Sequence, residues 1–233
     1  AIENTGYLTV TRSTLANNMS GSDGGAIDSG GSLGHDCACV AVSGSTFFGN
    51  ADGDFQAGLF QPASAGHVFG FLLTPSDGAA INIEGGSLLV WGSTFSGDVP
   101  YGGADIESGP GTVLLAGNII DETCAKDRGS WHDLGYNIAD GRSCLRGTRG
   151  DVDHGASKLA GWAYNGGPTP TMEPVKGSPA IGAIPYGTTL RLGGGLVSLC
   201  PTTDQRGVKS SPGRPCDAGA VQVTGRRLGA ASN

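Results

Sequence analysis

The sequence predicts an all-β fold built as a solenoid of short parallel strands, and three observations support this prediction. Four segments within the first 120 residues align without gaps, and their apolar positions coincide. The distances between these copies suit single turns of a coil. The copies are also rich in Val, Thr, Ser and Gly, which are poor helix formers, and they lack the i, i+3, i+4 pattern of a helix.

Each copy reads as two short strands joined by a bend. Its first apolar position holds Leu8, Val40, Leu88 and Val113, its second Val10, Val42, Val90 and Leu115, and its last Leu15, Phe47, Phe95 and Ile120. The first two positions alternate as on one face of a strand, whereas the last lies five residues further, so the chain must change direction in between. A glycine supplies the bend in three copies, at Gly44, Gly92 and Gly117. We expect the apolar columns to line the interior.

The spacing of the copies sets the size of each turn. Their polar position is occupied by Ser13, Ser45, Ser93 and Asn118, so the copies follow one another after 32, 48 and 25 residues. The shortest period suits one turn, and the longest is either two turns or one turn with a large excursion. The excursion at 51–77 is too apolar for a solvated loop, and we expect it to pack over the solenoid or a partner. A second element of small residues and an isoleucine, at 1–4, 24–28, 78–82 and 102–107, is predicted to form the other wall of each coil.

Charge and cysteine content exclude several classes of protein. The formal net charge is −7 and Lys and Arg do not cluster, which argues against a nucleic-acid partner. No apolar run approaches the roughly 20 residues that cross a bilayer. Six cysteines without a C-x-x-C pair indicate disulfides and secretion: Cys37, Cys39, Cys124, Cys144, Cys200 and Cys216. Since the chain starts without a signal-peptide pattern, we expect a removed signal peptide or a longer precursor.

Five motifs follow one another in the second half: Leu134–Ile138, Tyr164–Thr171, Gly177–Ile181, Thr203–Gly207 and Cys216–Ala220. Over about 120–223 they resemble the choice-of-anchor Q domain, a module of secreted or surface bacterial proteins. The repeats at 1–120 resemble right-handed parallel β-helix proteins of the polymorphic outer-membrane-protein type. The resemblance implies a right-handed parallel β-helix with a disulfide-stapled C-terminal cap: coils at 1–120, last coils and cap at 121–223, and a flexible tail at 224–233. It implies an extracellular or cell-surface bacterial protein but no particular reaction.

The resemblance also narrows the disulfide pairing, which the cysteine positions alone leave open. The family layout implies the pairs Cys124–Cys144 and Cys200–Cys216. Cys37 and Cys39 are then left to pair with each other.

The candidate ligand-binding residues are Trp91, Asp151 and Asp153. Trp91 lies between inward Val90 and Gly92, so it should point outward as the best exposed aromatic for stacking on a sugar. Asp151 and Asp153 alternate along a strand and would present two carboxylates on one side, the arrangement that paired-carboxylate hydrolysis or metal binding uses. The catalytic residues stay unknown.

Metal and cofactor binding have little support in the sequence. The histidines are dispersed, at His35, His67, His132 and His154, and predict no metal site. Ca²⁺ is the one candidate ion, at the turns 22–24 and 52–54, where carboxylates that bond local backbone amides are the competing interpretation. In the 203–207 motif, an Arg206 bonded to backbone carbonyls and to Asp204 or Asp217 is the structural interpretation.

These observations favour a structural or binding module that contacts glycans or neighbouring protein subunits. The alternative is a polysaccharide lyase or hydrolase, in which charged residues should cluster across adjacent coils on one face. Arg12, Arg128, Arg142, Arg146 and Arg149 are candidate bases by residue type alone. Nothing in the sequence closes the N-terminal coil, so we expect another subunit or an upstream precursor segment to cover it.

Overall fold

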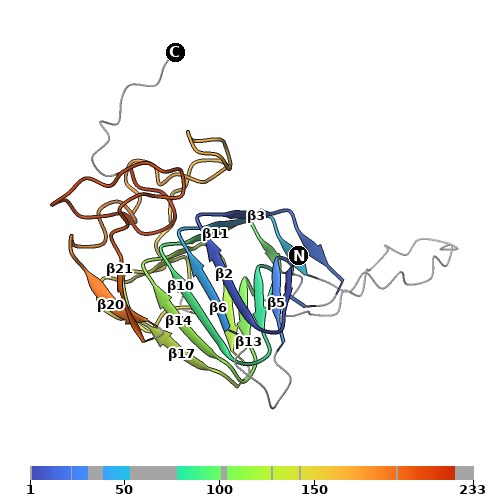
Figure 1. Cartoon of the computed structure of the whole chain (residues 1–233). Coiled ribbons are helices and arrows are strands. Elements are labelled where there is room, and N and C mark those ends of the chain that lie inside the picture. Colours follow the sequence, from blue (N-terminus) through green and yellow to red (C-terminus); the bar gives the residue numbers. More distant parts are fainter. Residues whose placement is uncertain are drawn as a thin grey trace, which may run out of the picture.

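The computed structural model describes residues 2–21, 23–30, 39–52, 78–100, 104–126, 128–141, 143–192 and 194–223. All regular elements in this part of the chain are β strands, and they stack as a parallel β-helix (Figure 1). The fold class predicted from the sequence is therefore confirmed. Cys37, much of the 51–77 excursion and the expected tail at 224–233 lie outside the described residues.

Three parallel sheets form the walls of the coil. Wall A contains β1 (Ile2–Asn4), β5 (Ile27–Ser29), β9 (Ile81–Ile83), β13 (Ile106–Ser108) and β16 (Cys124–Lys126). Wall B contains β2 (Tyr7–Thr11), β6 (Cys39–Ser43), β10 (Ser87–Trp91), β14 (Thr112–Ala116) and β17 (Ser130–Asp133). Wall C contains β3 (Thr14–Ala16), β7 (Thr46–Phe48), β11 (Thr94–Ser96), β15 (Ile119–Ile120), β18 (Ile138–Ala139) and β19 (Val152–Asp153).

Two smaller sheets complete the described strands. A short parallel sheet follows wall C and contains β4 (Met19–Ser20), β8 (Ala51–Asp52) and β12 (Val99–Pro100). Near the C-terminus, β20 (Thr189–Leu192) and β21 (Gly195–Ser198) form an antiparallel hairpin.

The strand register confirms the predicted apolar columns. Leu8, Val40, Leu88 and Val113 are direct partners along wall B, and Leu15, Phe47, Phe95 and Ile120 are direct partners along wall C. Both columns belong to one hydrophobic core inside the coil. Within it the rings of Phe47 and Phe95 stack with centroids 4.6 Å apart. Each coil thus buries its apolar residues against its neighbours, at roughly 1.5–3 kcal/mol per large side chain.

The register also decides which interpretation of the 48-residue spacing holds. β6 pairs directly with β10, with Val40 opposite Leu88, so this spacing is one turn that carries an inserted segment. The copies of the second repeated element pair in the same way along wall A, with Ile27 between Ile2 and Ile81.

A polar ladder runs along the corner between walls B and C. It contains Ser13, Ser45, Ser93, Asn118, Asn137 and Asp151. From Ser45 onward, each side-chain oxygen accepts the backbone N–H of the ladder residue one coil earlier, at N···O distances of 3.0–3.2 Å. The ladder satisfies N–H groups that the bend would otherwise bury without a partner. This need explains the Ser or Asn that the sequence repeats at this position.

A fifth coil follows the four found in the sequence. Trp131 is the partner of Val113, and Asp133 is the partner of Leu115. Ile138 then pairs with Ile119 in wall C, seven residues after Trp131 rather than six. The one-residue insertion in the bend and the Asp at an apolar position concealed this copy from a gapless alignment.

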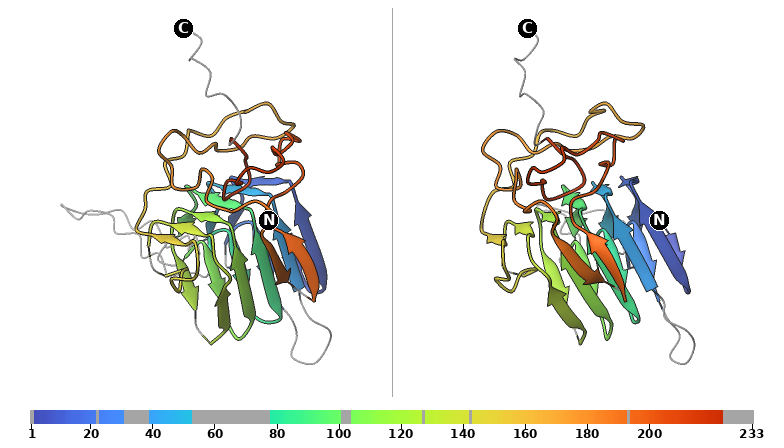
Figure 2. Two further views of the ribbon diagram at one scale, coloured as in Figure 1. Left: turned by 90° about the vertical axis from the view of Figure 1, so that its left-hand side faces the viewer. Right: turned by 60° about the vertical axis from the view of Figure 1, so that its left-hand side comes forward.

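The C-terminal segment 154–223, here called the cap, lies along the side of the coil stack instead of on its end (Figures 1 and 2). A second hydrophobic core joins Ile119 and Ile138, on the outer face of wall C, to Ile184 and Leu199 of the cap. Outward threonines of three successive coils also bind the cap. Thr14 Oγ1 donates to Pro170 O at 2.8 Å, Thr46 Oγ1 donates to Gln205 Oε1 at 2.6 Å, and Thr94 Oγ1 accepts from Ala220 N at 3.1 Å.

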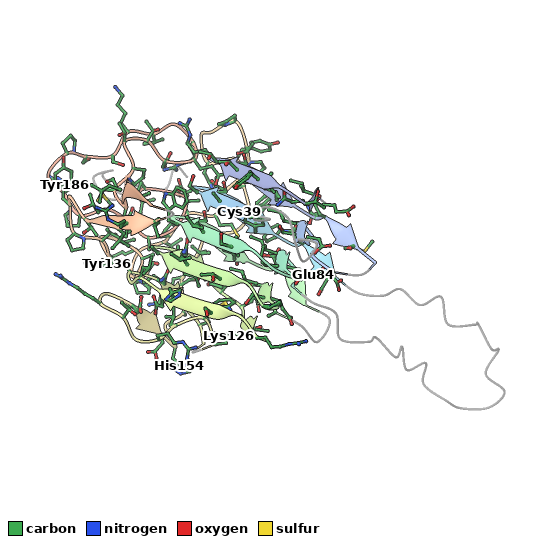
Figure 3. All side chains as sticks on the ribbon, turned by 60° about the horizontal axis from the view of Figure 1, so that its bottom comes forward. Cys39, Glu84, Lys126, Tyr136, His154 and Tyr186 are labelled. Atoms are coloured by element: carbon green, nitrogen blue, oxygen red, sulfur yellow. A yellow bond between two sulfur atoms is a disulfide. The ribbon has the colours of Figure 1, made fainter. Side chains whose placement is uncertain are left out.

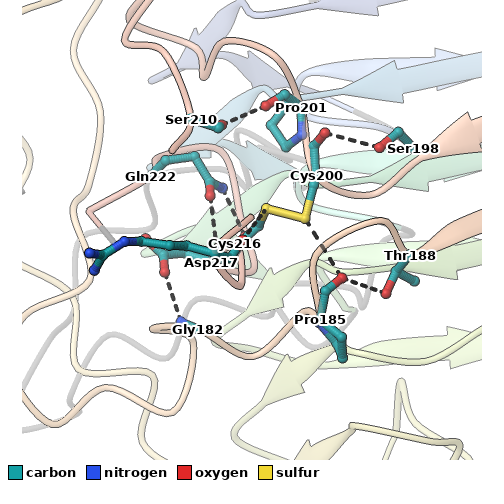
Figure 4. The surroundings of a disulfide bond; sticks show 11 residues. Gly182, Pro185, Thr188, Ser198, Cys200, Pro201, Ser210, Cys216, Asp217 and Gln222 are labelled. Atoms are coloured by element: carbon teal, nitrogen blue, oxygen red, sulfur yellow. Dashed lines mark hydrogen bonds between the residues drawn. A yellow bond between two sulfur atoms is a disulfide. The ribbon is translucent and has the colours of Figure 1, made fainter. Parts of the chain in front are cut away.

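Two of the predicted disulfides are present. Cys124–Cys144 lies in the last coils, and Cys200–Cys216 lies in the cap (Figure 4). They close loops of 20 and 16 residues, each contributing roughly 3 kcal/mol in the chain-entropy estimate. The third expected bridge, Cys37–Cys39, stays a prediction because Cys37 is outside the described residues.

Arg206 is a buried anchor within the cap, as the structural interpretation of its motif expects. Its Nε and Nη2 donate to Asp204 Oδ2 at 2.9 and 2.6 Å, and Nη2 also donates to Gln222 O at 2.9 Å. Nη1 binds Glu173 and the carbonyl of Asn165. The hydrogen bonds satisfy the guanidinium, so the motif ties distant cap segments together.

The first coil is less well covered than the coils that follow. Leu8 and Leu15 are only partly buried, whereas their partners are fully buried. Ile2, Tyr7 and Met19 are 37%, 78% and 62% exposed. The partner that the sequence analysis expects at this end stays a prediction. In the described part of the chain no helix is long and apolar enough to span a membrane.

Candidate functional site

A cavity of about 210 Å³ lies where the corner of wall B meets the cap. Three successive coils line one side, through Thr11, Arg12, Ser43, Gly44, Trp91 and Gly92. The cap lines the other side, through Ser198, Leu199, 201–204 and 219–220. We call this space the corner cavity. It lies below the roughly 300–1,000 Å³ of typical small-molecule sites, so it suits one unit of a longer ligand.

The bends of the coils form the floor of the corner cavity. Gly44 and Gly92 both line it, and both adopt left-handed backbone conformations, with φ of 52° and 56°. Glycine is suited to this conformation and adds no side chain to the space. In the first coil the equivalent residue is Arg12, which holds the same conformation with φ of 47°.

Trp91 points outward from wall B, as expected, and lines the corner cavity. Its direct partners are small, Ser43 on one side and Ala116 on the other. The indole is partly buried because it packs against the second hydrophobic core, which includes Ala116 and Leu199. The cap therefore covers part of the ring that the sequence analysis expected to be freely exposed.

Arg12 is the cationic side chain of the corner cavity. Its Nη1 donates to Thr203 Oγ1 of the cap at 3.2 Å, and its aliphatic stem lies over Gly44. Among the described residues it forms no ion pair with a carboxylate. Asp204 also lines the cavity, but its oxygens accept hydrogen bonds from Arg206, Val208 and Gln222.

Asp151 and Asp153 lie in different surroundings in the structure. Asp151 closes the corner ladder, where its Oδ1 accepts from Asn137 N at 3.0 Å. Asp153 is exposed in β19, next to His154 at the end of the stack (Figure 3). Instead of pairing with Asp153, Asp151 interacts with the neighbouring carboxyl of Asp133. Sequence analysis missed Asp133 because it occupies a position that is apolar in the other copies.

The carboxyls of Asp133 and Asp151 shift each other's pKa in opposite directions. Burial and the hydrogen bond to Asp133 raise the pKa of Asp151 to about 7. Burial opposes ionisation of Asp133 as well, but hydrogen bonds from Asp151 and from the N–H groups of Arg146 and Gly135 outweigh it and lower the pKa of Asp133. Asp133 Oδ2 accepts from Arg146 N at 2.8 Å, so the pair fastens the 144–151 loop to the fifth coil.

A second group of carboxyls lies beside wall A and belongs to the interior. Asp105 occupies the position that Ala26 and Ala80 hold in the preceding coils, since all three precede aligned isoleucines. Its side chain is 0% exposed, and neither oxygen has a hydrogen-bond partner among the described residues. Asp98 ends a ladder with Asn50, whose N and Nδ2 donate to Asp98 Oδ1 at 2.7 and 2.8 Å. Sequence analysis did not single out either residue.

Burial makes both of these carboxyls weak acids. Desolvation is the main cause and raises the pKa of Asp98 to about 7, against the hydrogen bonds from Asn50. Desolvation also raises the pKa of Asp105 well above its usual range, and Asp98, Glu122, Asp121 and Asp52 add repulsion.

No group of three or more His, Cys, Asp or Glu residues in the described part of the chain is arranged to hold a metal ion. Of the residues considered for Ca²⁺, Ser22, Gly53 and Asp54 lie outside the described residues, as do His35 and His67. Asp52 is buried, and Ca²⁺ binding stays a prediction. His132 and His154 are exposed.

The outer face of wall B lacks the clustered charges of a polysaccharide-degrading groove. Its outward positions in the first four coils carry no Asp, Glu, Lys or Arg: Tyr7, Thr9, Thr11, Cys39, Ala41, Ser43, Ser87, Leu89, Trp91, Thr112, Leu114 and Ala116. Of these outward residues Thr11, Ser43 and Trp91 line the corner cavity, whereas Ala116 is buried against the cap.

Comparison with known protein families, curated proteins and solved structures finds no match for this chain. The resemblance to choice-of-anchor Q and polymorphic outer-membrane-protein repeats therefore stays a prediction.

Proposed function

We propose that this chain is a secreted or cell-surface β-helix module that binds an extended glycan and acts as a structural or binding protein. The corner cavity is the observation that carries this proposal. It combines the indole of Trp91, the hydroxyls of Thr11, Ser43 and Thr203, and the guanidinium of Arg12. Sugar rings offer apolar C–H faces to aromatic side chains and hydroxyls to hydrogen-bonding groups, so these groups suit them.

The dimensions of the site favour one sugar unit of a longer chain. The corner cavity holds about 210 Å³, and the uncharged outer face of wall B continues from it across the coils. One unit would occupy the cavity while its neighbours lie along that face. Solenoids suit such ligands because their side chains repeat in register along the stack.

The disulfides support a location outside the cytoplasm. Cys124–Cys144 and Cys200–Cys216 are both formed, and such bridges persist in oxidising compartments. The proposed bacterial surface location rests on the motifs of the second half. Contact with a neighbouring subunit or an upstream segment is part of the same proposal, supported by exposed Tyr7 and Met19 on the first coil.

A polysaccharide hydrolase or lyase is the second candidate, and the Asp133–Asp151 pair favours it. Two carboxyls with pKa values displaced in opposite directions are a known acid–base arrangement. However, these two carboxyls interact directly with each other, whereas glycosidase carboxyls stand roughly 5–9 Å apart to admit the sugar. The carboxyl oxygens of the pair also accept hydrogen bonds from the backbone N–H groups of Asn137 and Arg146. The binding role is therefore the better supported one.

Glycan-array screening followed by calorimetry on the best oligosaccharide tests the proposal. Trp91→Ala should weaken binding at least tenfold, while Trp91→Phe should retain part of it. Tyr164→Ala is the matched control, because Tyr164 is a 74% exposed aromatic of the cap away from the cavity lining. A protein that retains no glycan, or a Trp91→Ala variant that binds as tightly as the native chain, would refute the proposal.

A degradation screen with and without Ca²⁺ separates the two candidates. The native chain should release no new sugar ends from extracellular polysaccharides under either condition. Cleavage that disappears in Asp133→Asn would establish the catalytic alternative instead.

A further inference from the structure

We propose that Arg12 selects the ligand of the corner cavity, and that this ligand is a sugar unit bearing a carboxylate or a sulfate. The inference rests on the proposed glycan-binding function and names its substrate class. Three features support it: the backbone conformation of Arg12, the position of its guanidinium, and the hydrogen bonds that already occupy Asp204, the other charged side chain of the cavity.

The backbone at Arg12 is the first feature. The corner requires a left-handed conformation in every coil, and Gly44, Gly92 and Gly117 meet it with φ of 52°, 56° and 63°. Arg12 holds φ of 47° although a side chain is disfavoured there. The next corner of the same coil has Asn17 in this conformation, but asparagine adopts it readily. Arginine offers no such local reason, and strained residues cluster at functional sites.

The position of the guanidinium is the second feature. Because Gly44 has no side chain, the stem of Arg12 extends over it, with Arg12 Cγ in ordinary van der Waals contact at that site. One hydrogen bond, from Nη1 to Thr203 Oγ1, holds the group at the cavity wall. A guanidinium has five N–H donors, and no described carboxylate pairs with this one. The remaining donors match the oxygens of a carboxylate or sulfate.

The electrostatics of the lining are the third feature. Arg12 and Asp204 are the charged residues of the lining. Asp204 is 2% exposed and bound by Arg206, Val208 and Gln222, so it offers a ligand neither a free acceptor nor an accessible charge. A cation therefore faces the cavity next to an aromatic ring and hydroxyls. A neutral sugar would offer the guanidinium only hydroxyl oxygens, whereas an acidic sugar would form a charge-assisted pair with it.

Calorimetry at 150 mM salt with two matched pairs of probes tests the inference. Oligogalacturonate is compared with its methyl ester, and dextran sulfate with dextran. The native chain should bind the anionic member of at least one pair tenfold or more tightly than its neutral partner. The pair that shows the difference identifies carboxylate or sulfate as the group recognised.

Arg12→Gly is the decisive variant, because glycine is the residue that the equivalent corners already carry. It should abolish the preference for the anionic probe while its unfolding temperature stays equal or rises. Arg12→Lys should keep only part of the preference, since it retains the charge but loses the planar fork. Arg191→Gln, a change at an exposed arginine of β20, is the control and should change nothing.

Each contrary outcome has a distinct meaning. Equal affinity for charged and neutral probes overturns this inference and leaves the glycan-binding function standing. A preference that survives in Arg12→Gly overturns the assignment of Arg12. An unfolding temperature that falls with the preference intact identifies Arg12 as an anchor for the cap. Failure of all four probes overturns the inference, and the glycan array then decides the proposed function separately.

Discussion

Replacing Asp105 with alanine is expected to stabilise the fold. The position is already alanine in the two preceding coils, at Ala26 and Ala80, so the wall accommodates that residue without strain. In the native chain both carboxyl oxygens of Asp105 are buried without a hydrogen-bond partner among the described residues. The substitution removes this unsatisfied group and leaves the backbone pairing of β13 unchanged.

The magnitude follows from two opposing effects. An unsatisfied buried polar group costs roughly 1–3 kcal/mol. Removing the carboxyl leaves a small void, which costs about 1 kcal/mol if the neighbours do not collapse into it. The net gain in unfolding free energy should therefore be about 0–2 kcal/mol at pH 5.

The gain should be larger at pH 8, and the sign follows from the raised pKa. In the folded state Asp105 keeps its proton above the unfolded pKa of about 3.9. Its protonated form therefore adds most to the unfolding free energy below that pH, and this contribution is lost as pH rises through the folded pKa. Asp98 behaves in the same way up to its pKa of about 7. The pKa of Asp98 is about three units higher in the folded state than in the unfolded state, and each unit corresponds to about 1.4 kcal/mol. Ionisation of Asp98 can therefore lower the unfolding free energy by at most roughly 4 kcal/mol.

Urea unfolding of the native chain and of Asp105→Ala at pH 5 and pH 8 measures both effects. The native chain should lose stability between these values, and the variant should lose less. Glu3→Ala, at an exposed carboxylate of the first coil, is the control and should follow the native chain. If Asp105→Ala is less stable than the native chain, or loses as much unfolding free energy as the native chain between pH 5 and pH 8, the buried carboxyl is satisfied in solution.

Three further outcomes are expected. Gly219→Ala should lower the stability of the cap by about 2 kcal/mol or more, roughly the cost of overpacking. A Cβ at this position would lie 2.7 Å from Thr94 Oγ1, and the backbone has φ of +85°. Hydrogen exchange that stays slow in the cap of the variant would contradict this. Asp133→Asn should lower the pKa of Asp151 from about 7, since the neighbouring carboxylate that raises this pKa is removed. NMR titration of the Asp151 carboxyl carbon measures the change, and an unshifted midpoint would contradict an interaction between the two carboxyls. Light scattering should show self-association through the first coil that weakens in Tyr7→Ser, because this 78% exposed side chain lies beside open strand edges; a strict monomer at high concentration would exclude it.

The sequence by itself determined the coil and its interior. The alternation of Leu8 and Val10, followed by a bend and Leu15, recurs in four copies and directly predicts the register observed in walls B and C. This prediction succeeds because each coil places its side chains by local geometry, and neighbouring coils repeat that geometry. The Cys124–Cys144 and Cys200–Cys216 disulfides, which the resemblance to the choice-of-anchor Q domain implied, are present.

Only the tertiary structure decided where the cap lies and what it creates. Trp91 and Arg12 become parts of one cavity because residues 198–204 and 219–220 return across three coils. The hydrogen bonds that hold this arrangement join positions far apart in the chain, such as Thr46 and Gln205, 159 residues apart. No local pattern encodes such contacts, because they depend on the fit between two completed surfaces. For the same reason the sequence did not reveal Asp105 as a buried acid, since its environment is set by the neighbouring coils and not by the residues beside it.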